Sequence, residues 1–599
     1  MHANPSSEPE RSRGSGISGV GAFQFVLHSH LPYCRRAGRW PHGEEWLHEA
    51  LAETYIPLLN TLNDLRERDI CCRMTLSMTP VLVEQLADAD ICASFIVYLD
   101  EEIDMASRDV ARFGRTGDGQ LHYMANYYRD YYEAIKESFV ERYDQDVVGE
   151  FRRLQDDGCI EISTCAATHG YLPLLSRDAS IFAQIRTAVV SYERHFGRAP
   201  RTIWLPECAY RPAQRDPDGV LRPGLEAFLA AQGLRCFFVE TSSIEQGHAG
   251  YRPRAALAMG PYAMAERRFQ EADGAASAAS SQADVSPELS PESSAKSGGT
   301  TYRAYMVSQP DGAITSPPVA VIGRNERTGM QVWSAEWGYP GDPAYREFHR
   351  KDPVSGLQYW RVTGPDTELG DKDTYHPDWA DERIGEHAAH YAGLVKELLQ
   401  DYAHQKKEYG LISSNYDTEL FGHWWFEGVR WIGQVLAHLA EDSAVDLVTT
   451  SSYLASHPPE RALSVPEGSW GAGGTHWTWD NPDTHWMWAP IHGAERRMER
   501  LVAEHPQAEG ALLAALNQAA RELLLLQSSD WPFLVTTGQA REYATRRFSE
   551  HLSRFEQLVQ AIDAHDEAEA DELAAKFFAL DNAFPDLDYR WFAERQGRA

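Results

Sequence analysis

Residues 202–208 read TIWLPEC, a short apolar run followed at once by a proline and by the carboxylate of Glu207. Residues 411–417 repeat this pattern as LISSNYD, in which a second apolar run ends at Asp417. Both runs have the length and composition of β-strands. The other strands that we predict are residues 23–27, 73–77, 159–164, 236–239, 331–333 and 446–449.

Longer amphipathic segments separate these strands. They are residues 45–68, 181–196, 224–232 and 383–407. Strands that alternate with helices predict an α/β fold with a parallel sheet, either open or closed into a barrel. Residues 88–157 contain almost no strand signal, which predicts a helical insertion between the second and third strands.

The remaining segments differ in composition from this core. Residues 1–20 are polar and small, without the apolar segment of a signal peptide, so we expect a disordered tail and a cytoplasmic protein. Residues 271–300 are rich in Ala, Ser, Glu, Pro and Gly and predict a disordered loop, because they cannot bury enough apolar surface to offset their ordering entropy. From about residue 494 the pattern is helical, and we assign residues 456–599 to a helical C-terminal domain.

Charge and cysteine usage narrow the class of protein. The net charge of −32 argues against nucleic acid or an anionic membrane as a partner, because both require basic surfaces. No stretch approaches the roughly 18–20 apolar residues of a membrane span. The eight cysteines lie within the first 236 residues without a CxxC pair, which predicts buried reduced thiols rather than disulfides or a zinc site.

Four of the predicted strands run into residues that are used in catalysis. The first is followed by His28 and His30, the third by His169, and two others end at Glu207 and Asp417. In a parallel barrel the C-terminal strand ends open on one face, where active sites are assembled. We therefore expect these side chains to converge.

Two carboxylates at separate strand ends fit glycoside chemistry, in which one attacks the anomeric carbon and the other handles the proton of the leaving group. In a retaining enzyme they would lie about 5–5.5 Å apart. A salt bridge or a charge at a helix N-terminus is the structural alternative for Glu207. Glu419 is an alternative to Asp417 as the second carboxylate, because residues two apart on a strand point to the same side.

The alternation of His28 and His30 places both imidazoles on one strand face. Such a pair is typical of a metal site, and together with Asp417 it suggests a carboxylate-assisted deacetylase. No further His/Asp cluster at ligand spacing lies nearby, and histidines can instead hydrogen-bond sugar hydroxyls. For His169 a buried core histidine is the alternative.

Residues 470–488 hold five tryptophans among Gly, Asn and Thr. They are Trp470, Trp477, Trp479, Trp486 and Trp488. Their spacing is not helical, which favours a platform that stacks on sugars and excludes water over a simple core stripe. Packing between the barrel and the helical domain is the alternative.

Five stretches resemble the motifs of glycoside hydrolase family 57, and of its branching enzymes in particular. They are HSHLPY at residues 28–33, residues 158–174, WLPECAY at 204–210, YDTELFGHWW at 416–425 and TTSSYL at 449–454. Weaker similarity extends to residues 332–342, 469–471, 479–481 and 527–531. The resemblance runs from about residue 22 to residue 580.

The resemblance implies an incomplete (β/α)7 barrel with a helical insertion, an all-α C-terminal domain, and no metal or other cofactor. The Glu of the third motif is the nucleophile, which places that role on Glu207. The first Asp of the fourth motif is the acid/base, which favours Asp417 over Glu419. The substrate-binding residues that we predict are His28, His30, His169, Trp333, Trp470, Trp479 and Asp530.

The implied reaction cleaves α-1,4 links of an α-glucan and transfers the chain to a 6-hydroxyl. An α-amylase or 4-α-glucanotransferase of the same family is the nearest alternative, followed by a metal-dependent polysaccharide deacetylase and a non-catalytic glucan-binding protein. Branching enzymes of the family carry a tyrosine on a loop over the active site. Residues 241–265 match that loop less clearly, so Tyr251 and Tyr262 are both candidates, and the oligomeric state stays open.

Overall fold

The computed structural model describes residues 19–70, 72–215, 219, 221–245, 264–272, 298–334 and 337–594. Nearly all of the predicted N-terminal tail, most of the predicted 271–300 loop, Cys71 and both candidate tyrosines, Tyr251 and Tyr262, lie outside these residues.

Seven parallel strands form the centre of the molecule. In spatial order they are β10 (Gly410–Asp417), β1 (Gly21–Ser29), β2 (Met74–Met78), β3 (Ile160–Ser163), β4 (Thr202–Ile203), β7 (Cys236–Val239) and β9 (Ala320–Gly323). The first and last of these, β10 and β9, meet through a hydrogen bond from the Asn325 N–H, just after β9, to the Ser413 carbonyl oxygen at 2.9 Å. The expected incomplete (β/α)7 barrel is thus confirmed.

Short strands extend the barrel at its edges. β11 (Val445–Leu447) pairs with the start of β1, and β8 (Tyr305–Val307) lies antiparallel to β9 and parallel to β12 (Ala462–Leu463). β5 (Gln214–Arg215) and β6 (Leu221–Arg222) form a separate pair. Alternate residues of β1 and β10 face the interior, as the hydrogen bond from Gln24 to Ser413 at 2.9 Å shows.

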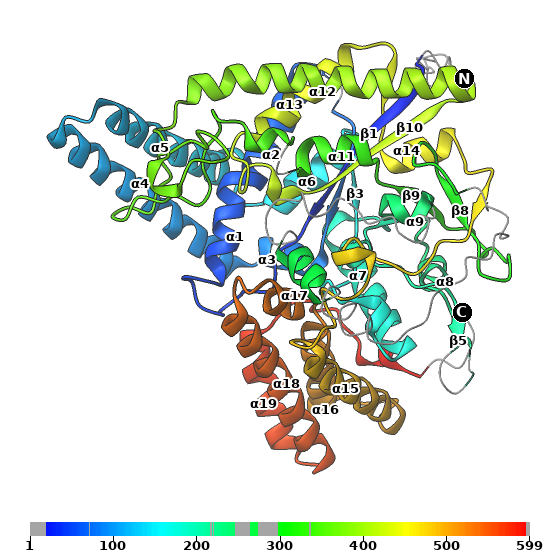
Figure 1. Ribbon diagram of the computed structural model, residues 1–599. Coiled ribbons are helices and arrows are strands. Elements are labelled where there is room, and N and C mark those ends of the chain that lie inside the picture. Colours follow the sequence, from blue (N-terminus) through cyan, green and yellow to red (C-terminus); the bar gives the residue numbers. More distant parts are fainter. Residues whose placement is uncertain are drawn as a thin grey trace, which may run out of the picture.

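Helices cover the outside of the barrel (Figure 1). They are α1 (Glu44–Ala50), η1 (Leu51–Tyr55), α2 (Ile56–Glu67), α3 (Pro80–Leu86), α7 (Asp178–Phe196), α8 (Leu225–Ala231), α9 (Thr241–Glu245), α11 (Glu326–Trp333), α12 (Pro377–Lys406), α13 (Gly428–Glu441) and α14 (Thr450–Ser456). Short 3-10 turns complete the connections. The expected strand at residues 331–333 is wrong, because these residues form the C-terminal end of α11, which Asn325 caps by accepting a hydrogen bond from the Thr328 N–H.

A long helical hairpin projects from the barrel between β2 and β3 (Figure 1). It consists of α4 (Ala89–Thr116) and α5 (Gly119–Glu137), followed by η2 (Ser138–Arg142) and α6 (Val147–Asp156). Asp88, Asp118 and Asp146 cap the three α-helices by accepting backbone hydrogen bonds. These helices occupy the segment in which the sequence predicts an insertion.

A bundle of helices packs against the other side of the barrel (Figure 1). It comprises α15 (His485–Glu504), α16 (Gly510–Leu526), α17 (Asp530–Thr537), α18 (Arg541–Asp563) and α19 (Glu567–Leu580). The loop before α17 reaches the barrel, where the Ser529 N–H donates to the His169 carbonyl oxygen at 3.1 Å. The bundle therefore lies against the strand ends that carry the predicted site.

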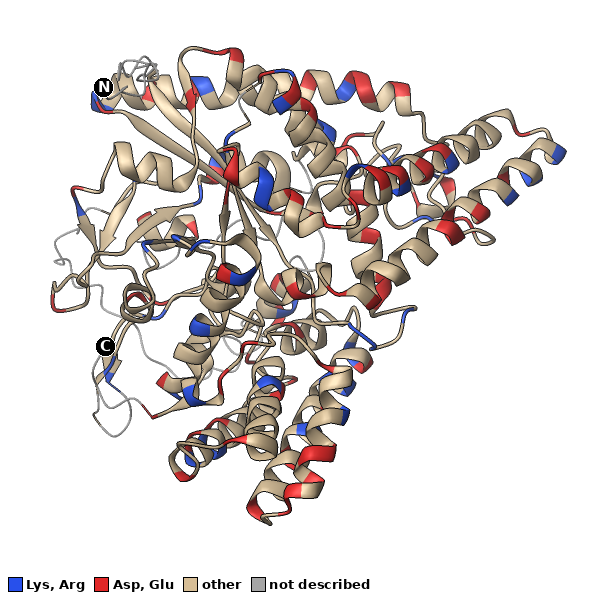
Figure 2. Cartoon of the chain, turned by 180° about the vertical axis from the view of Figure 1, so that it is seen from behind, with Lys and Arg blue, Asp and Glu red and all other residues tan. Residues whose placement is uncertain are grey.

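Acidic residues occur along many helices, including the α4/α5 hairpin and the C-terminal bundle (Figure 2). This distribution accounts for the net charge of −32 and disfavours polyanionic partners. Within the described ranges, no helix has both the length and the apolar character that a membrane crossing requires.

Candidate active site

The C-terminal strand ends lie in one row across four strands. Asp417 of β10 pairs in register with His28 of β1, His28 with Ser77 of β2, and Ser77 with Ser163 of β3. Residues in register on parallel strands point to the same side of the sheet. Asp417 and His28 are therefore neighbours inside the barrel mouth, although 388 residues lie between them in the sequence.

Glu207 sits on a 3-10 turn, η4 (Pro206–Cys208), directly after β4. Its backbone is left-handed, with φ of 60° and ψ of 27°, and Cys208 follows with φ of 49°. Such conformations are costly for residues other than glycine and persist where the surrounding structure enforces them. Here the turn directs a buried carboxylate into the barrel mouth.

Trp470 binds Glu207 twice. Its indole Nε1 donates to Glu207 Oε2 at 2.6 Å, and its backbone N–H donates to the Glu207 carbonyl oxygen at 3.1 Å. The other carboxylate oxygen, Oε1, lies 3.9 Å from His169 Nδ1. One oxygen of the carboxylate is thus fixed by an indole, and the other lies on the side of the histidines.

The three predicted histidines form a stack beside Glu207. The rings of His30 and His169 lie 3.9 Å apart, and His28 is stacked on Trp204 at 4.8 Å. His28 Nε2 and His169 Nε2 are hydrogen-bonded at 3.1 Å, and His28 Nδ1 contacts Ser77 Oγ at 3.2 Å. Burial first, and then the neighbouring histidines, lower the pKa of His28 and His169 well below the usual value, which keeps both rings neutral.

Two residues of the helical bundle complete the histidine cluster. Ser529 Oγ lies 2.7 Å from His169 Nδ1, and Asp530 Oδ1 lies 2.8 Å from His30 Nε2. Burial opposes charge on His30, but the carboxylates of Asp530, Glu419 and Glu207 outweigh it and raise the His30 pKa. Of the three histidines, His30 is therefore the one most readily protonated.

Asp417 and Glu419 are both drawn into the barrel mouth. Glu419 Oε1 accepts hydrogen bonds from the Tyr55 hydroxyl and, at 3.1 Å, from the His30 N–H. Burial raises the pKa of Glu419 to about 7, against the opposing effect of these hydrogen bonds. Burial, followed by the charges of Glu419 and Glu207, raises the pKa of Asp417 well above its usual value, while Arg324 acts in the opposite direction.

The predicted aromatic residues occupy different environments. Trp470 is half-buried, packs edge-on against Trp204 at 5.1 Å and lies under the Arg324 guanidinium at 5.8 Å. Trp333 is half-buried at the C-terminal end of α11. Trp479 departs from the expectation of a sugar platform, because its side chain is fully buried and its ring stacks on Tyr171 at 4.3 Å. In this conformation Trp479 packs between barrel and bundle and offers no exposed face to a sugar.

The sequence did not single out several residues that shape the site. They lie on four separate segments and are Tyr55, Ser77, Arg324 and Ser529. Three of them contact a site residue, namely Glu419, His28 or His169, and the charge of Arg324 lowers the pKa of Asp417. Ser77 is the last residue of the predicted strand 73–77, so the strand-end argument could have found it. Tyr55 lies inside a helical segment and Ser529 in the bundle, where no local pattern marks them.

Some of these side chains could also hold a cation. His28, Cys165 and His169, and likewise His30, His169 and Asp530, bring their potential ligand atoms within 4.8 Å of one another. The histidine nitrogens also contact each other, Ser77, Ser529 and Asp530. These contacts use both ring nitrogens of His28 and of His169 and fix the orientations of the rings.

Known proteins share this architecture. The family model for glycosyl hydrolase family 57 matches residues 24–466, and the model described as 1,4-alpha-glucan branching enzyme, C-terminal, matches residues 490–592. The 1,4-alpha-glucan branching enzyme TK1436 of Thermococcus kodakarensis is 43% identical over 550 residues, which is 90% of this chain and 74% of that protein.

Two solved structures are similar over nearly their whole length. The GH57-type branching enzyme of Pyrococcus horikoshii matches with a TM-score of 0.81 and 40% identity, covering 97% of this chain and 98% of that one. The α-amylase AmyC of Thermotoga maritima matches with a TM-score of 0.76 and 29% identity, covering 96% and 99%. The chain therefore belongs to glycosyl hydrolase family 57, and it carries the C-terminal domain described for 1,4-alpha-glucan branching enzymes.

Proposed function

We propose that the chain is a retaining 1,4-α-glucan branching enzyme in which Glu207 is the nucleophile and Asp417 the acid/base. Its similarity to two branching enzymes over most of their length, and the branching-enzyme C-terminal domain, support the reaction. The observation that carries the assignment of roles is the pair of hydrogen bonds from Trp470, which fix Glu207 at the barrel mouth. Asp417 lies in the adjoining row of strand ends, where burial and the charges of Glu419 and Glu207 raise its pKa well above the usual value.

In the first half-reaction Glu207 attacks C1 of a glucose unit, and the bond from C1 to the O4 of the next unit breaks. Asp417 donates its proton to that departing O4. The raised pKa of Asp417 suits this step, because a general acid must carry its proton at the working pH. The donor chain is then an ester on Glu207.

In the second half-reaction the 6-hydroxyl oxygen of an acceptor glucan attacks C1, and the ester bond to Glu207 breaks. The hydroxyl proton passes to Asp417. The ester carries no negative charge, so one of the charges that raise the pKa of Asp417 is absent at this stage. Asp417 is then less readily protonated, which suits its second role as a general base.

The remaining predicted residues surround the donor glucose in this proposal. Hydroxyls of the glucose replace some of the contacts that His28, His169 and the His30–Asp530 pair make within the cluster. Trp470, whose indole binds Glu207, borders the site with aromatic surface that also limits the access of water, and we assign Trp333 to the same surface. Water and the acceptor hydroxyl compete for the same ester, so this surface decides between hydrolysis and transfer.

A hydrolytic α-amylase is the second candidate. It is supported by the similarity to the α-amylase AmyC, which is 29% identical and covers 96% of this chain. A 4-α-glucanotransferase would leave the same site intact and differ only in the acceptor hydroxyl. The products separate the three possibilities.

The test is incubation of the purified protein with amylose, followed by measurement of reducing ends and of α-1,6 linkages by proton NMR and isoamylase debranching. We expect new α-1,6 linkages with few new reducing ends, and loss of both in Glu207→Gln. Glu150→Gln, which alters a buried carboxylate of α6, is the matched control and should remain active. Reducing ends without α-1,6 linkages would contradict branching, and activity in Glu207→Gln would contradict the nucleophile.

Treatment with a chelator separates this proposal from the deacetylase interpretation of the histidines. We expect EDTA to leave branching unchanged, because every step above uses only Glu207, Asp417 and the glucan. Loss of activity that zinc restores would show that His30, His169 and Asp530 act as metal ligands. A cytoplasmic location stays a prediction from the sequence, which cell fractionation would test.

A further inference from the structure

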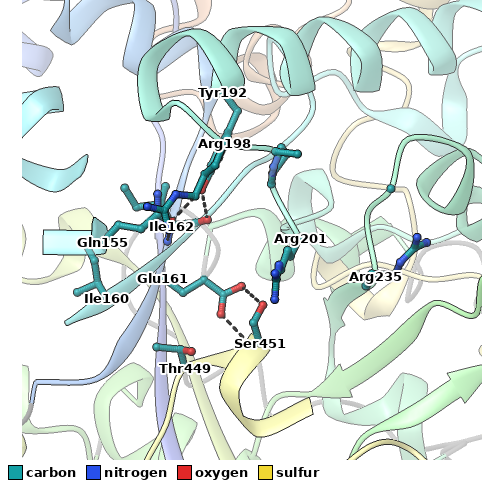
Figure 3. A pocket seen from close by; sticks show the side chains of 13 residues that line it. Gln155, Ile160, Glu161, Ile162, Tyr192, Arg198, Arg201, Arg235, Thr449 and Ser451 are labelled. Atoms are coloured by element: carbon teal, nitrogen blue, oxygen red, sulfur yellow. Dashed lines mark hydrogen bonds between the residues drawn. The ribbon is translucent and has the colours of Figure 1, made fainter. Parts of the chain in front are cut away.

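A second cavity opens at the end of the barrel opposite the strand ends that carry Glu207 and Asp417. Its volume is about 750 Å³, and it lies where β3, β4 and β7 begin and where α14 packs across the barrel. Figure 3 shows Glu161 and Ser451 on one side of this cavity and the arginines Arg198, Arg201 and Arg235 around the rest. The catalytic proposal uses none of these residues.

Arg201 and Arg235 are neighbours because the strands that follow them, β4 and β7, are adjacent in the sheet. They directly precede β4 and β7, whose first residues pair in register, and the Arg235 N–H donates to the Arg201 carbonyl oxygen at 2.7 Å. Like charges on neighbouring strands repel, which costs stability unless an opposite charge compensates. Neither guanidinium has a hydrogen bond or ion pair with any side chain that the structure describes.

The other charged groups of the cavity are already engaged. Glu161 accepts hydrogen bonds from the Ser451 N–H at 2.6 Å, from Ser451 Oγ at 2.7 Å and from Thr202 Oγ1 at 2.9 Å. Arg198 pairs with Asp156, which lies outside the cavity lining. Because Arg198 is paired with Asp156, the two arginines Arg201 and Arg235 against the one carboxylate of Glu161 leave the cavity lining with a net positive charge, within a chain of net charge −32.

The lining also offers apolar surface for an organic group. Ile160, Ala199 and Pro200 lie beside the arginines, and the Tyr192 hydroxyl is held by Gln155 at 2.9 Å and by the Ile162 carbonyl oxygen at 2.8 Å. The volume falls within the roughly 300–1,000 Å³ that small-molecule sites occupy. The cavity therefore combines apolar lining residues with the guanidinium groups of Arg201 and Arg235, which are exposed to solvent and have no partner among the described side chains.

We propose that this cavity binds a small phosphorylated metabolite, with Arg201 and Arg235 holding the phosphate. Guanidinium forks bind phosphate oxygens through paired, charge-assisted hydrogen bonds. The net charge of −32 disfavours a long polyanion such as nucleic acid and favours a compact anion as the ligand. The site is separate from the catalytic proposal and stands or falls without it.

Isothermal titration calorimetry at constant ionic strength tests the site with inorganic phosphate and glucose 1-phosphate as probes and glucose as the neutral comparison. We expect saturable binding of phosphate or glucose 1-phosphate to the full chain, weakened at least about tenfold in R201Q/R235Q. Tighter binding of glucose 1-phosphate than of phosphate would support a phosphorylated metabolite, whereas equal or tighter binding of free phosphate would contradict an organic group in the ligand.

Two further variants control for charge and folding. R108Q/R546Q removes two exposed arginines of α4 and α18 and should bind as the wild type does. R201K/R235K keeps the charge but not the forks, and we expect intermediate affinity. Thermal melting shows that each variant is folded. The proposal is overturned by absence of binding up to ~10 mM, by equal affinity in R201Q/R235Q, or by equal loss in R108Q/R546Q.

Discussion

The indole Nε1 of Trp470 donates a 2.6 Å hydrogen bond to Oε2 of Glu207, across 263 positions of sequence. The backbone of Trp470 donates a second bond to the carbonyl oxygen of Glu207, whose φ of 60° places it in the left-handed region. The residue that holds Glu207, the proposed nucleophile, thus comes from the segment between the barrel and the helical bundle. Side-chain position and backbone strain are stabilised by the same tryptophan.

Replacing Trp470 by Phe removes the indole donor and keeps an aromatic ring. A hydrogen bond to a charged group contributes about 1.5–3 kcal/mol, so we expect kcat for branching to fall on the order of 10- to 100-fold. The melting temperature should change little. Trp477→Phe alters a tryptophan that packs on Phe269, and serves as the control. Full activity in Trp470→Phe would show that Glu207 does not need this bond.

Glu419→Gln is expected to move the alkaline limb of the pH–activity profile to lower pH. Asp417 must be protonated for the first step, so activity falls as the pH rises through its pKa. The charge of Glu419 helps to raise that pKa, and its removal lowers it. Gln can still accept the hydrogen bonds of Tyr55 and His30 through the same oxygen.

The profile of kcat/KM between pH 5 and 10 measures this shift, with Glu150→Gln as the control carboxylate. Because Asp417 and Glu419 interact, the limb reports the titration of the pair in the wild type and of Asp417 alone in the variant. An alkaline limb that stays in place or moves upward would contradict the electrostatic role of Glu419.

Asp417→Asn should abolish branching and raise thermal stability at neutral pH. The pKa of Asp417 is higher in the folded than in the unfolded chain, so the folded state binds more protons and loses stability as the pH rises above the unfolded value of about 3.9. Asn carries no charge and avoids this loss. Differential scanning calorimetry should show a higher melting temperature for the variant at pH 7 and no gain near pH 4. A melting temperature below that of the wild type at pH 7 would refute the prediction.

Two substitutions of Trp479 distinguish packing from substrate binding. Trp→Ala in a core costs about 3–5 kcal/mol, so Trp479→Ala should lower the melting temperature clearly. Trp479 Nε1 has no hydrogen-bond partner among the described residues, so Trp479→Phe should cost much less. Unfolding is followed by thermal melting and KM for amylose by kinetics. A raised KM in a stable Trp479→Phe would show that the tryptophan is uncovered to meet glucan.

The strand-end argument from the sequence placed most of the site correctly in space. His28, His169 and Glu207 lie in contact or near contact, and Asp417 is the register neighbour of His28. This worked because parallel strands align their C-terminal ends whatever their separation in sequence. The roles of Glu207 and Asp417 themselves came from the family resemblance and remain predictions.

The errors have local causes. Residues 331–333 were expected in a strand, yet a short apolar run is the same in a strand and in the last turn of a helix such as α11. β9 was missed because it has only four residues and follows two prolines, Pro317 and Pro318. The contact of Tyr55 with Glu419 depends on how η1 packs beside the end of β10, and the contact of Ser529 with His169 depends on how the bundle packs on the barrel, so no local pattern could predict either.

The dependence of Glu207 on Trp470 and of the histidines on Ser529 and Asp530 also sets an order of events during synthesis. The two proposed catalytic carboxylates, Glu207 and Asp417, leave the ribosome before Asp530. Asp530 follows Asp417 by 113 positions. At roughly 5–20 residues per second this interval lasts about 6–23 s. Through that time the nascent barrel carries its reactive groups without the partners that position them, so the enzyme becomes active only when the bundle has docked.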